Sequence, residues 1–358
     1  MQSLQGYLLS AKSNIYTSQV VILGNEAADL DSMVSSIAYG YLRKQIRPEL
    51  SVLPLMPIPR ADFALRNEVI YVFNEAGIIL DDLVFMDEVN LDALFEHAEI
   101  VLVDHNQITE RLAKYSAKIT GIIDHHRDEG LYPDAFPRII TTIGSTTTLV
   151  AQEFVKASVE ISKNLAILLG ATILLDTVNL AETAGRVTDA DREAAAAILP
   201  LCPLPQQELF ERVQEAKFNV DGFSTNDLLR KDYKEWQLGS SVVGIGSALL
   251  SVIDWIKRDA DLAAGFETFY TAKKLNLLLS MNAFHRPDFQ RDLVLFTKSN
   301  DESDALYGYL QEKGLKLSAI KSAEVKQPEN GHIACYHQGN LDISRKKLQP
   351  LLLEYLQH

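Results

Sequence analysis

The sequence lacks the features that mark several large classes of protein. Its 358 residues include only two cysteines, Cys202 and Cys335, which lie far apart and predict no disulfide framework. No apolar run approaches the roughly 18 residues that a membrane-spanning helix needs. The opening residues show no basic stretch followed by an apolar one, so we expect no signal peptide and a cytoplasmic location.

Basic residues are also fewer than acidic ones, and the difference is much larger in the first part of the chain than in the second. The formal net charge of −14 argues against nucleic-acid binding through a basic face. Residues 1–208 carry 15 Lys and Arg against 28 Asp and Glu, whereas residues 209–358 carry 19 against 20. The first part is therefore suited to divalent cations, and the second has basic residues to spare for an anion. An acidic surface that serves only solubility would give the same composition.

Strand-like and helix-like segments alternate along the first half of the chain. This alternation predicts an α/β domain with a mostly parallel sheet flanked by helices, whose ligands lie beyond the carboxyl ends of the strands. The prolines of segment 51–59 should keep it at a sheet edge or in a loop. The run GSTTTLVAQEFVKA (144–157) should open a helix on hydroxyl caps. The strand-like segments are 18–23, 51–59, 100–103 and 119–123.

A stretch with three prolines, LPLCPLPQQ (199–207), is the best candidate for a linker. We therefore expect two domains, in keeping with the length of the chain. The first would span residues 1–198. The second, smaller one would be an α/β domain with a mixed sheet over 208–358, opening with helix over 208–235.

Acidic side chains follow the ends of four expected elements. Asp29 and Asp31 follow the first strand, and paired carboxylates of this kind suit a hard cation such as Mg²⁺ or Mn²⁺. Asp104 follows the strand 100–103, and Asp176 ends a long apolar helix. The fourth cluster, Asp124-His125-His126, would be costly to bury unless a cation bound there. Helix caps, a solvated turn and a helix end facing water are the alternatives for these acids.

Taken together, these segments resemble the DHH phosphoesterase superfamily. The motifs GNEAADLDS, LVDHN, GIIDHH and LLDT follow the order and spacing of the family. The similarity is closest to the cytosolic exopolyphosphatase branch, which is related to family II inorganic pyrophosphatases and to prune-type proteins. The runs AKFNVDGFSTNDLLRKDYK and SRKK resemble the C-terminal domain of those branches, so the resemblance covers nearly the whole chain.

The resemblance implies a dinuclear metal site and a phosphate-binding second domain. Asp104 would bridge the two ions, and His126 would face the phosphate. Together with Asp104 and His126, three basic residues complete the implied catalytic set: Lys217, Arg345 and Lys346. The metal ligands that the resemblance implies are Asp29, Asp31, Asp104, His125 and Asp176.

Asn25 departs from the family pattern, because the pyrophosphatases carry a metal-binding histidine there. An asparagine offers an amide oxygen or no ligation at all, which favours Mg²⁺ and places Asn25 among the substrate-binding positions. We therefore expect an exopolyphosphatase that releases terminal orthophosphate from inorganic polyphosphate through water activated by two metal ions. An inorganic pyrophosphatase and a prune-like interaction protein with weak phosphatase activity are the alternatives. We expect a monomer that binds neither nucleic acid nor a membrane.

Overall fold

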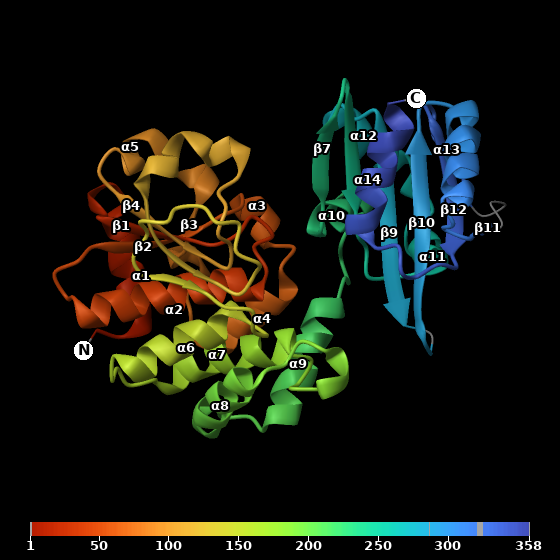
Figure 1. Cartoon of the computed structure of the whole chain (residues 1–358). Helices are drawn as coiled ribbons and strands as arrows, with labels where there is room; N and C mark the ends of the chain where they lie inside the picture. The colour runs from red at the N-terminus through yellow and green to blue at the C-terminus, as the bar shows by residue number, and fades with distance from the viewer. Residues whose placement is uncertain (1, 286, 321–324, 358) are drawn as a thin grey trace. The chain divides into compact units, whose positions relative to one another are not determined.

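The expected alternation of strands and helices is realised as a six-stranded sheet in the first of two units, Met1–Asn219 (Figure 1). The computed structural model describes residues 2–285, 287–320 and 325–357. The strand order is β3-β2-β1-β4-β5-β6 and all neighbours run parallel, which confirms the predicted fold class. The strands are β1 (Val20–Leu23), β2 (Val52–Met56), β3 (Val84–Phe85), β4 (Glu99–Val103), β5 (Ile119–Asp124) and β6 (Arg138–Ile140).

Helices cover this sheet and share one hydrophobic core with it. α2 packs against β1 and β2 and also against α6 and α7. α7 is apolar on all sides, which fits its position among α2, α4, α6, α8 and α9. The α-helices of this unit are α1 (Leu4–Ser13), α2 (Leu30–Ile46), α3 (Arg60–Phe63), α4 (Asn67–Glu75), α5 (Leu91–Phe95), α6 (Thr146–Lys156), α7 (Lys163–Asp176), α8 (Asp189–Ile198) and α9 (Gln206–Phe218).

The second unit, Val220–His358, has a mixed sheet with the order β11-β12-β10-β9-β8-β7. Only β8 and β9 run parallel; the other neighbours are antiparallel. One sheet face packs under α10, α11 and α12, and the other under α13 and α14. The elements are α10 (Thr225–Lys231), β7 (Lys234–Leu238), β8 (Ser241–Gly246), α11 (Val252–Arg258), α12 (Leu262–Ala272), β9 (Leu277–His285), β10 (Phe289–Thr297), α13 (Asn300–Glu312), β11 (Leu317–Ala319), β12 (His332–Gln338) and α14 (Arg345–Leu356).

The two units divide later in the chain than the expected linker. Residues 199–201 form a short 3-10 helix, and α9 begins at Gln206. Because α9 packs on α4 and α7, the segment 199–207 lies within the first unit, and the division falls between Asn219 and Val220.

Two local expectations were wrong. Segment 51–59 contains β2, which is fully buried and lies inside the sheet between β1 and β3. Pro54 is tolerated there because the two-residue β3 pairs only with Leu55 and Met56, so a missing N–H at Pro54 removes no bond to β3. Helix was expected up to residue 235, but Lys234–Leu238 is strand β7, which antiparallel pairing with β8 holds extended. Across the described residues, no helix combines the length and the apolar character needed to cross a bilayer.

Candidate metal site

The predicted acids of the first unit lie at the carboxyl edge of its sheet, around the place where the strand order reverses. β1 and β4 are neighbours, yet the chain continues from β1 toward β3 and from β4 toward β6. Asp29 and Asp31 follow β1, Asp104 follows β4, and Asp124 ends β5. Ligand sites in open parallel sheets form at this reversal, so the topology brings together acids that are far apart in sequence.

Asp104, His125 and His126 form the tightest group of candidate metal ligands among the described residues. His125 Nε2 lies 3.3 Å from Asp104 Oδ1 and 3.8 Å from Asp31 Oδ2. The other ring nitrogen of His125, Nδ1, lies 3.1 Å from the carbonyl oxygen of Ile143. A carbonyl only accepts, so Nδ1 carries a proton and Nε2 faces the acids. Metal-binding histidines are commonly oriented in this way.

His126 is held by the first residue of its own motif. Its Nδ1 lies 2.8 Å from Asp124 Oδ1, and the Asp124 side chain is fully buried. Burial alone would raise the pKa of Asp124, but the hydrogen bonds from His126 and Asn106 lower it below its ordinary value. Asp124 therefore stays ionised and orients His126, leaving Nε2 of this half-exposed ring directed away from the pair.

Asp31 is bound by donors from a distant segment of the chain. Its Oδ1 accepts from Ser145 Oγ at 2.9 Å and from Thr147 N and Oγ1 at 2.8 and 2.7 Å. Ser35 Oγ adds a further contact at 3.2 Å. Oδ2 accepts from Thr146 N at 2.7 Å. Because Oδ1 already has four donors, Oδ2, which faces His125, is the oxygen that Asp31 can offer to a cation.

Asp29 and Asp176 border the same cluster, and Lys217 lies near both. Asp29 caps α2 by accepting from Ser32 N at 3.1 Å, so the capping alternative holds for one of its oxygens. The side chain of Asp29 is partly accessible, but the surrounding protein and the charge of Asp31 raise its pKa, which Lys217 partly lowers. Burial, Asp31 and Asp29 raise the pKa of Asp176 well above its usual range.

The electrostatics of the cluster fit a bound cation. Burial and the charge of Asp31 raise the pKa of Asp104 well above its ordinary value, although His125 lowers it in part. Burial would lower the pKa of His125, but Asp104 and Asp31 outweigh burial and raise it to about 10. A proton on Nε2 thus takes the place between imidazole and carboxylates that a metal ion could occupy. Asp176 Oδ2 is buried without a hydrogen-bond partner, as expected of an oxygen that serves a cation.

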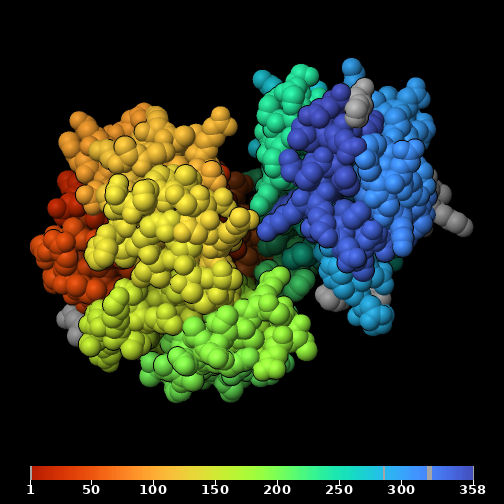
Figure 2. All heavy atoms as spheres, in the orientation of Figure 1, coloured from red at the N-terminus to blue at the C-terminus, as the bar shows by residue number. Residues whose placement is uncertain are grey.

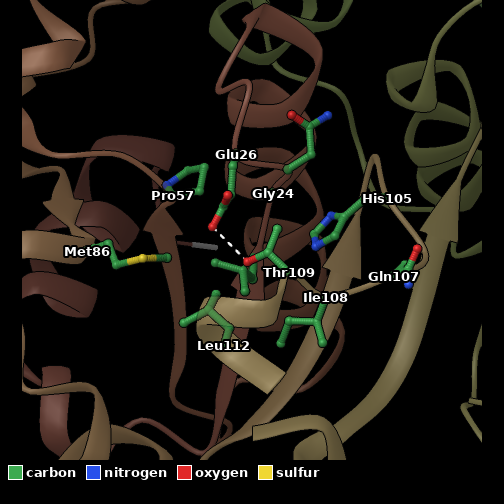
Figure 3. A pocket seen from close by; sticks show the side chains of 11 residues that line it. Gly24, Glu26, Pro57, Met86, His105, Gln107, Ile108, Thr109 and Leu112 are labelled. Carbon is green, nitrogen blue, oxygen red and sulfur yellow. Dashed lines mark hydrogen bonds between the residues drawn. The ribbon is translucent and has the colours of Figure 1, made fainter. Parts of the chain in front are cut away.

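Asn25 stands between this cluster and a neighbouring cavity. Its Nδ2 donates to the backbone oxygen of Asp104 at 3.0 Å and also to Asp104 Oδ2, while its Oδ1 accepts from Ala27 N at 2.8 Å. As placed, Asn25 is thus a donor to Asp104. The cavity, of about 90 Å³, lies at the ends of β1 to β4, and Glu26 bonds to Thr109 across its lining (Figure 3).

The predicted anion-binding residues Arg345 and Lys346 belong to the second unit. They open α14, which runs along the surface of that unit (Figure 2, dark blue). Arg345 donates from Nη1 to the backbone oxygen of Asp232 at 2.8 Å and from Nη2 to Asp232 Oδ1 at 2.7 Å. Lys346 and Lys347 are exposed. The first turn of α14 contains no acid and its N-cap, Ser344, makes no side-chain cap bond.

Sequence reasoning missed the residues that hold the ligands. The hydroxyl run 145–147 was expected to cap α6, but Ser145 makes no cap bond. The side chains of Ser145 and Thr147 bind Asp31 instead, and that of Thr146 lies beside Asp104. Asp124 and Asn106 were visible within the motifs, but the sequence does not show that Asn106 donates to Asp124 Oδ2 while Asp124 Oδ1 contacts His126 Nδ1. Asp191 gave no sequence signal beyond its place near the start of an alanine-rich helix.

Comparison with known proteins agrees with this architecture. Residues 19–173 match the model of the DHH family N-terminal domain, and residues 211–355 match the DHHA2 domain. A Schizosaccharomyces pombe protein provisionally named an exopolyphosphatase is 33% identical over 93% of this chain and 90% of its own length. Exopolyphosphatase PRUNE1 of Rattus norvegicus is 31% identical over 99% of this chain and 79% of its own.

More distant relatives carry a different name. A manganese-dependent inorganic pyrophosphatase of Methanothrix thermoacetophila is 26% identical over 73% of this chain and 80% of its own length. A Methanococcus jannaschii structure provisionally described as a family II inorganic pyrophosphatase shares the fold, with a TM-score of 0.59, 20% identity and coverage of 94% and 99%. The chain therefore belongs to the DHH family, in the branch that carries a C-terminal DHHA2 domain.

Proposed function

We propose that this protein is a metal-dependent exopolyphosphatase that hydrolyses the terminal phosphoanhydride bond of inorganic polyphosphate. The observation that carries the proposal is the cluster of Asp31, Asp104 and His125, in which two carboxylates converge on His125 Nε2 at 3.8 and 3.3 Å. The named relatives that match nearly the whole chain support the substrate class.

In this proposal the ligands are Asp29, Asp31, Asp104, His125 and Asp176, which would hold two Mg²⁺ or Mn²⁺ ions. Bound divalent ions would lower the pKa of a water molecule and so supply the nucleophile at neutral pH. Asp31 can bind through Oδ2 because its Oδ1 is saturated by protein donors. Asn25 restrains Asp104 through its amide, which makes it a positioning group rather than a ligand.

Basic and imidazole groups would then bind the phosphate oxygens. Asp124 contacts Nδ1 of His126 and so orients the ring, which leaves Nε2 to face a phosphoryl oxygen. Lys217 adds positive charge beside Asp29 and Asp176. On the second unit, Arg345 and Lys346 begin a helix where cations oppose the helix dipole, a cost that a bound anion would offset.

Phosphate release from polyphosphates of defined length, with pyrophosphate measured beside them, tests the substrate. We expect metal-dependent release of orthophosphate from polyphosphate, faster than from pyrophosphate, with Mg²⁺ and with Mn²⁺. A preference for pyrophosphate would instead identify an inorganic pyrophosphatase, in line with the 26% identical relative. Asp92→Asn is a matched control, because Asp92 is an exposed carboxylate that pairs with Lys114.

No release from either substrate with either metal would refute the proposed activity. That result, together with stable capture of a protein partner, would favour the prune-like interaction protein.

A further inference from the structure

A buried carboxylate outside the ligand set anchors the segment that holds the ligands. Asp191, in the first turn of α8, is fully buried. Its Oδ2 accepts from Gly144 N at 2.9 Å, and its Oδ1 accepts from Thr148 Oγ1 at 2.7 Å. These two partners stand directly before and after Ser145, Thr146 and Thr147. Asp191 therefore fixes both ends of this three-residue segment.

The anchored segment donates to two of the proposed metal ligands. Ser145, Thr146 and Thr147 give Asp31 four of its hydrogen bonds. Thr146 Oγ1 also lies 3.3 Å from Asp104 Oδ1. The geometry of Asp31 and Asp104 thus depends on a segment whose own position depends on Asp191.

The surroundings of the Asp191 carboxylate are closely packed, and its hydrogen-bond partners are all donors. Besides Gly144 and Thr148, Asp191 Oδ2 accepts from Thr188 N at 2.8 Å and Thr188 Oγ1 at 2.7 Å. All four partners are donors, so an ionised carboxylate satisfies them and an amide cannot. A side chain at Gly144 would place its Cβ 2.8 Å from Asp191 Oδ2 and 2.6 Å from Thr177 Cγ2, so the backbone can approach only as glycine.

We propose that Asp191 is a positioning residue for the metal site, acting through segment 144–148 on Asp31 and Asp104. The inference rests on the proposed function, since it assumes that these two carboxylates bind metal. If Asp191 merely capped α8, its loss would lower stability and leave metal affinity unchanged. If it positions the ligands, its loss weakens metal binding in a protein that is still folded.

Mn²⁺ binding to the full chain, stripped with EDTA, separates the two roles. Free Mn²⁺ is measured by its electron paramagnetic resonance signal, which falls as the ion binds, and circular dichroism confirms the fold. For Asp191→Asn we expect the Kd for Mn²⁺ to rise about tenfold or more, the range found for groups that support metal ligands. Thr148→Val keeps nearly the same side-chain volume and removes the hydrogen bond from Thr148 to Asp191, so it should raise the Kd for Mn²⁺ about threefold. This variant distinguishes the two roles if Asp191→Asn does not fold.

Asp227→Asn is the matched control. Asp227 occupies the same third position of a capping box, in α10 of the second unit, and bonds to Ser224 N and Oγ. Its replacement should leave the Kd within twofold of wild type. Unchanged affinity in Asp191→Asn and Thr148→Val, beside a wild type that binds Mn²⁺, would overturn this inference alone. Absence of Mn²⁺ binding by the wild type would overturn the proposed function as well.

Discussion

Asp104→Asn should separate stability from metal binding more cleanly than an alanine substitution. Asp104 has a φ of +62°, a region that Asp and Asn adopt more readily than other residues with a Cβ. Alanine would add about 1–2 kcal/mol of backbone strain there, which would confuse loss of a ligand with loss of fold. Asparagine keeps the shape and the backbone conformation, removes the charge and replaces one acceptor oxygen with an NH₂ group.

The sign of the effect on the metal-free protein follows from the raised pKa of Asp104. Each unit by which the pKa in the folded state exceeds that in the unfolded state corresponds to about 1.4 kcal/mol of lost stability at a pH above both. Burial and Asp31 raise the pKa of Asp104 well above its usual range, so the carboxylate destabilises the metal-free fold at neutral pH. Removal of the charge in Asp104→Asn should therefore raise stability. The new NH₂ group opposes this gain, because it faces the donor Nδ2 of Asn25 at a cost of about 1–3 kcal/mol.

We therefore expect metal-free Asp104→Asn to be more stable than metal-free wild type. In a unit of 219 residues, each 1 kcal/mol of added stability would raise the Tm by about 2–4 °C. Addition of Mn²⁺ at about 100 times its Kd should stabilise the wild type by about 2.7 kcal/mol and the variant by much less. Phosphate release by the variant should fall at least about 1000-fold, because an amide is a much poorer metal ligand than a carboxylate.

Differential scanning calorimetry in EDTA and in Mn²⁺, beside a phosphate-release assay, measures all three effects. The control Asp92→Asn should keep both the Mn²⁺-induced rise in Tm and the activity. A variant that is clearly less stable than wild type in EDTA would refute the electrostatic reasoning. A variant that keeps the full response to Mn²⁺ would refute the role of Asp104 as a ligand.

Three further predictions concern pH, the anion-binding residues and Asn25. The pKa values of Asp104, Asp176 and His125 are raised in the fold, so protonation favours the metal-free folded state. Urea unfolding in EDTA should therefore show the free energy of unfolding falling from pH 5 to pH 9, and saturating Mn²⁺ should reduce this pH dependence. A free energy of unfolding that rises with pH in EDTA would contradict the raised pKa values. Arg345, which bonds to Asp232 in the structure, can offer a phosphate two parallel N–H groups that a lysine cannot, so Arg345→Lys should raise the KM for polyphosphate about tenfold with a smaller change in kcat. Lys347→Arg is the control, and an unchanged KM would remove Arg345 from the anion site. Asn25→His adds an imidazole beside Asp104, so it should tighten Mn²⁺ binding and raise the rate of pyrophosphate hydrolysis relative to that of polyphosphate. An unchanged affinity for Mn²⁺ would show that position 25 does not select the metal.

The proposed ligands could be selected from the sequence because each one lies just after a strand, at the start of a helix or at the end of a helix. Parallel strands bring such positions to one edge, so Asp31, Asp104 and His125 were expected together, and both carboxylates lie within 4 Å of His125 Nε2. The groups that orient these ligands could not be predicted. Ser145 binds Asp31 across 114 positions, and its place in a hydroxyl run before a helix suggested a cap.

The errors in the fold have a similar origin. The prolines of segment 51–59 argued for an edge, but the consequence of a missing N–H depends on whether a partner strand extends that far. β3 ends after two residues, and this length is not visible in the local sequence around Pro54. Lys234–Leu238 follows a helix without a strong break and becomes a strand only because β8 is beside it.

The cluster links the stability of the first unit to its proposed chemistry. Burial is the main cause of the raised pKa values of Asp104 and Asp176, and repulsion from the neighbouring carboxylates adds to it. The protein holds Asp31 with five hydrogen bonds from backbone and hydroxyl groups, and these donors fix its direction without adding a positive charge. Neutral donors preserve the negative field of the site, whereas a lysine or arginine in their place would neutralise it. The carboxylate of Asp104 therefore destabilises the metal-free fold, and a bound divalent cation would offset that cost. Removal of its charge should weaken metal binding and stabilise the metal-free unit at the same time.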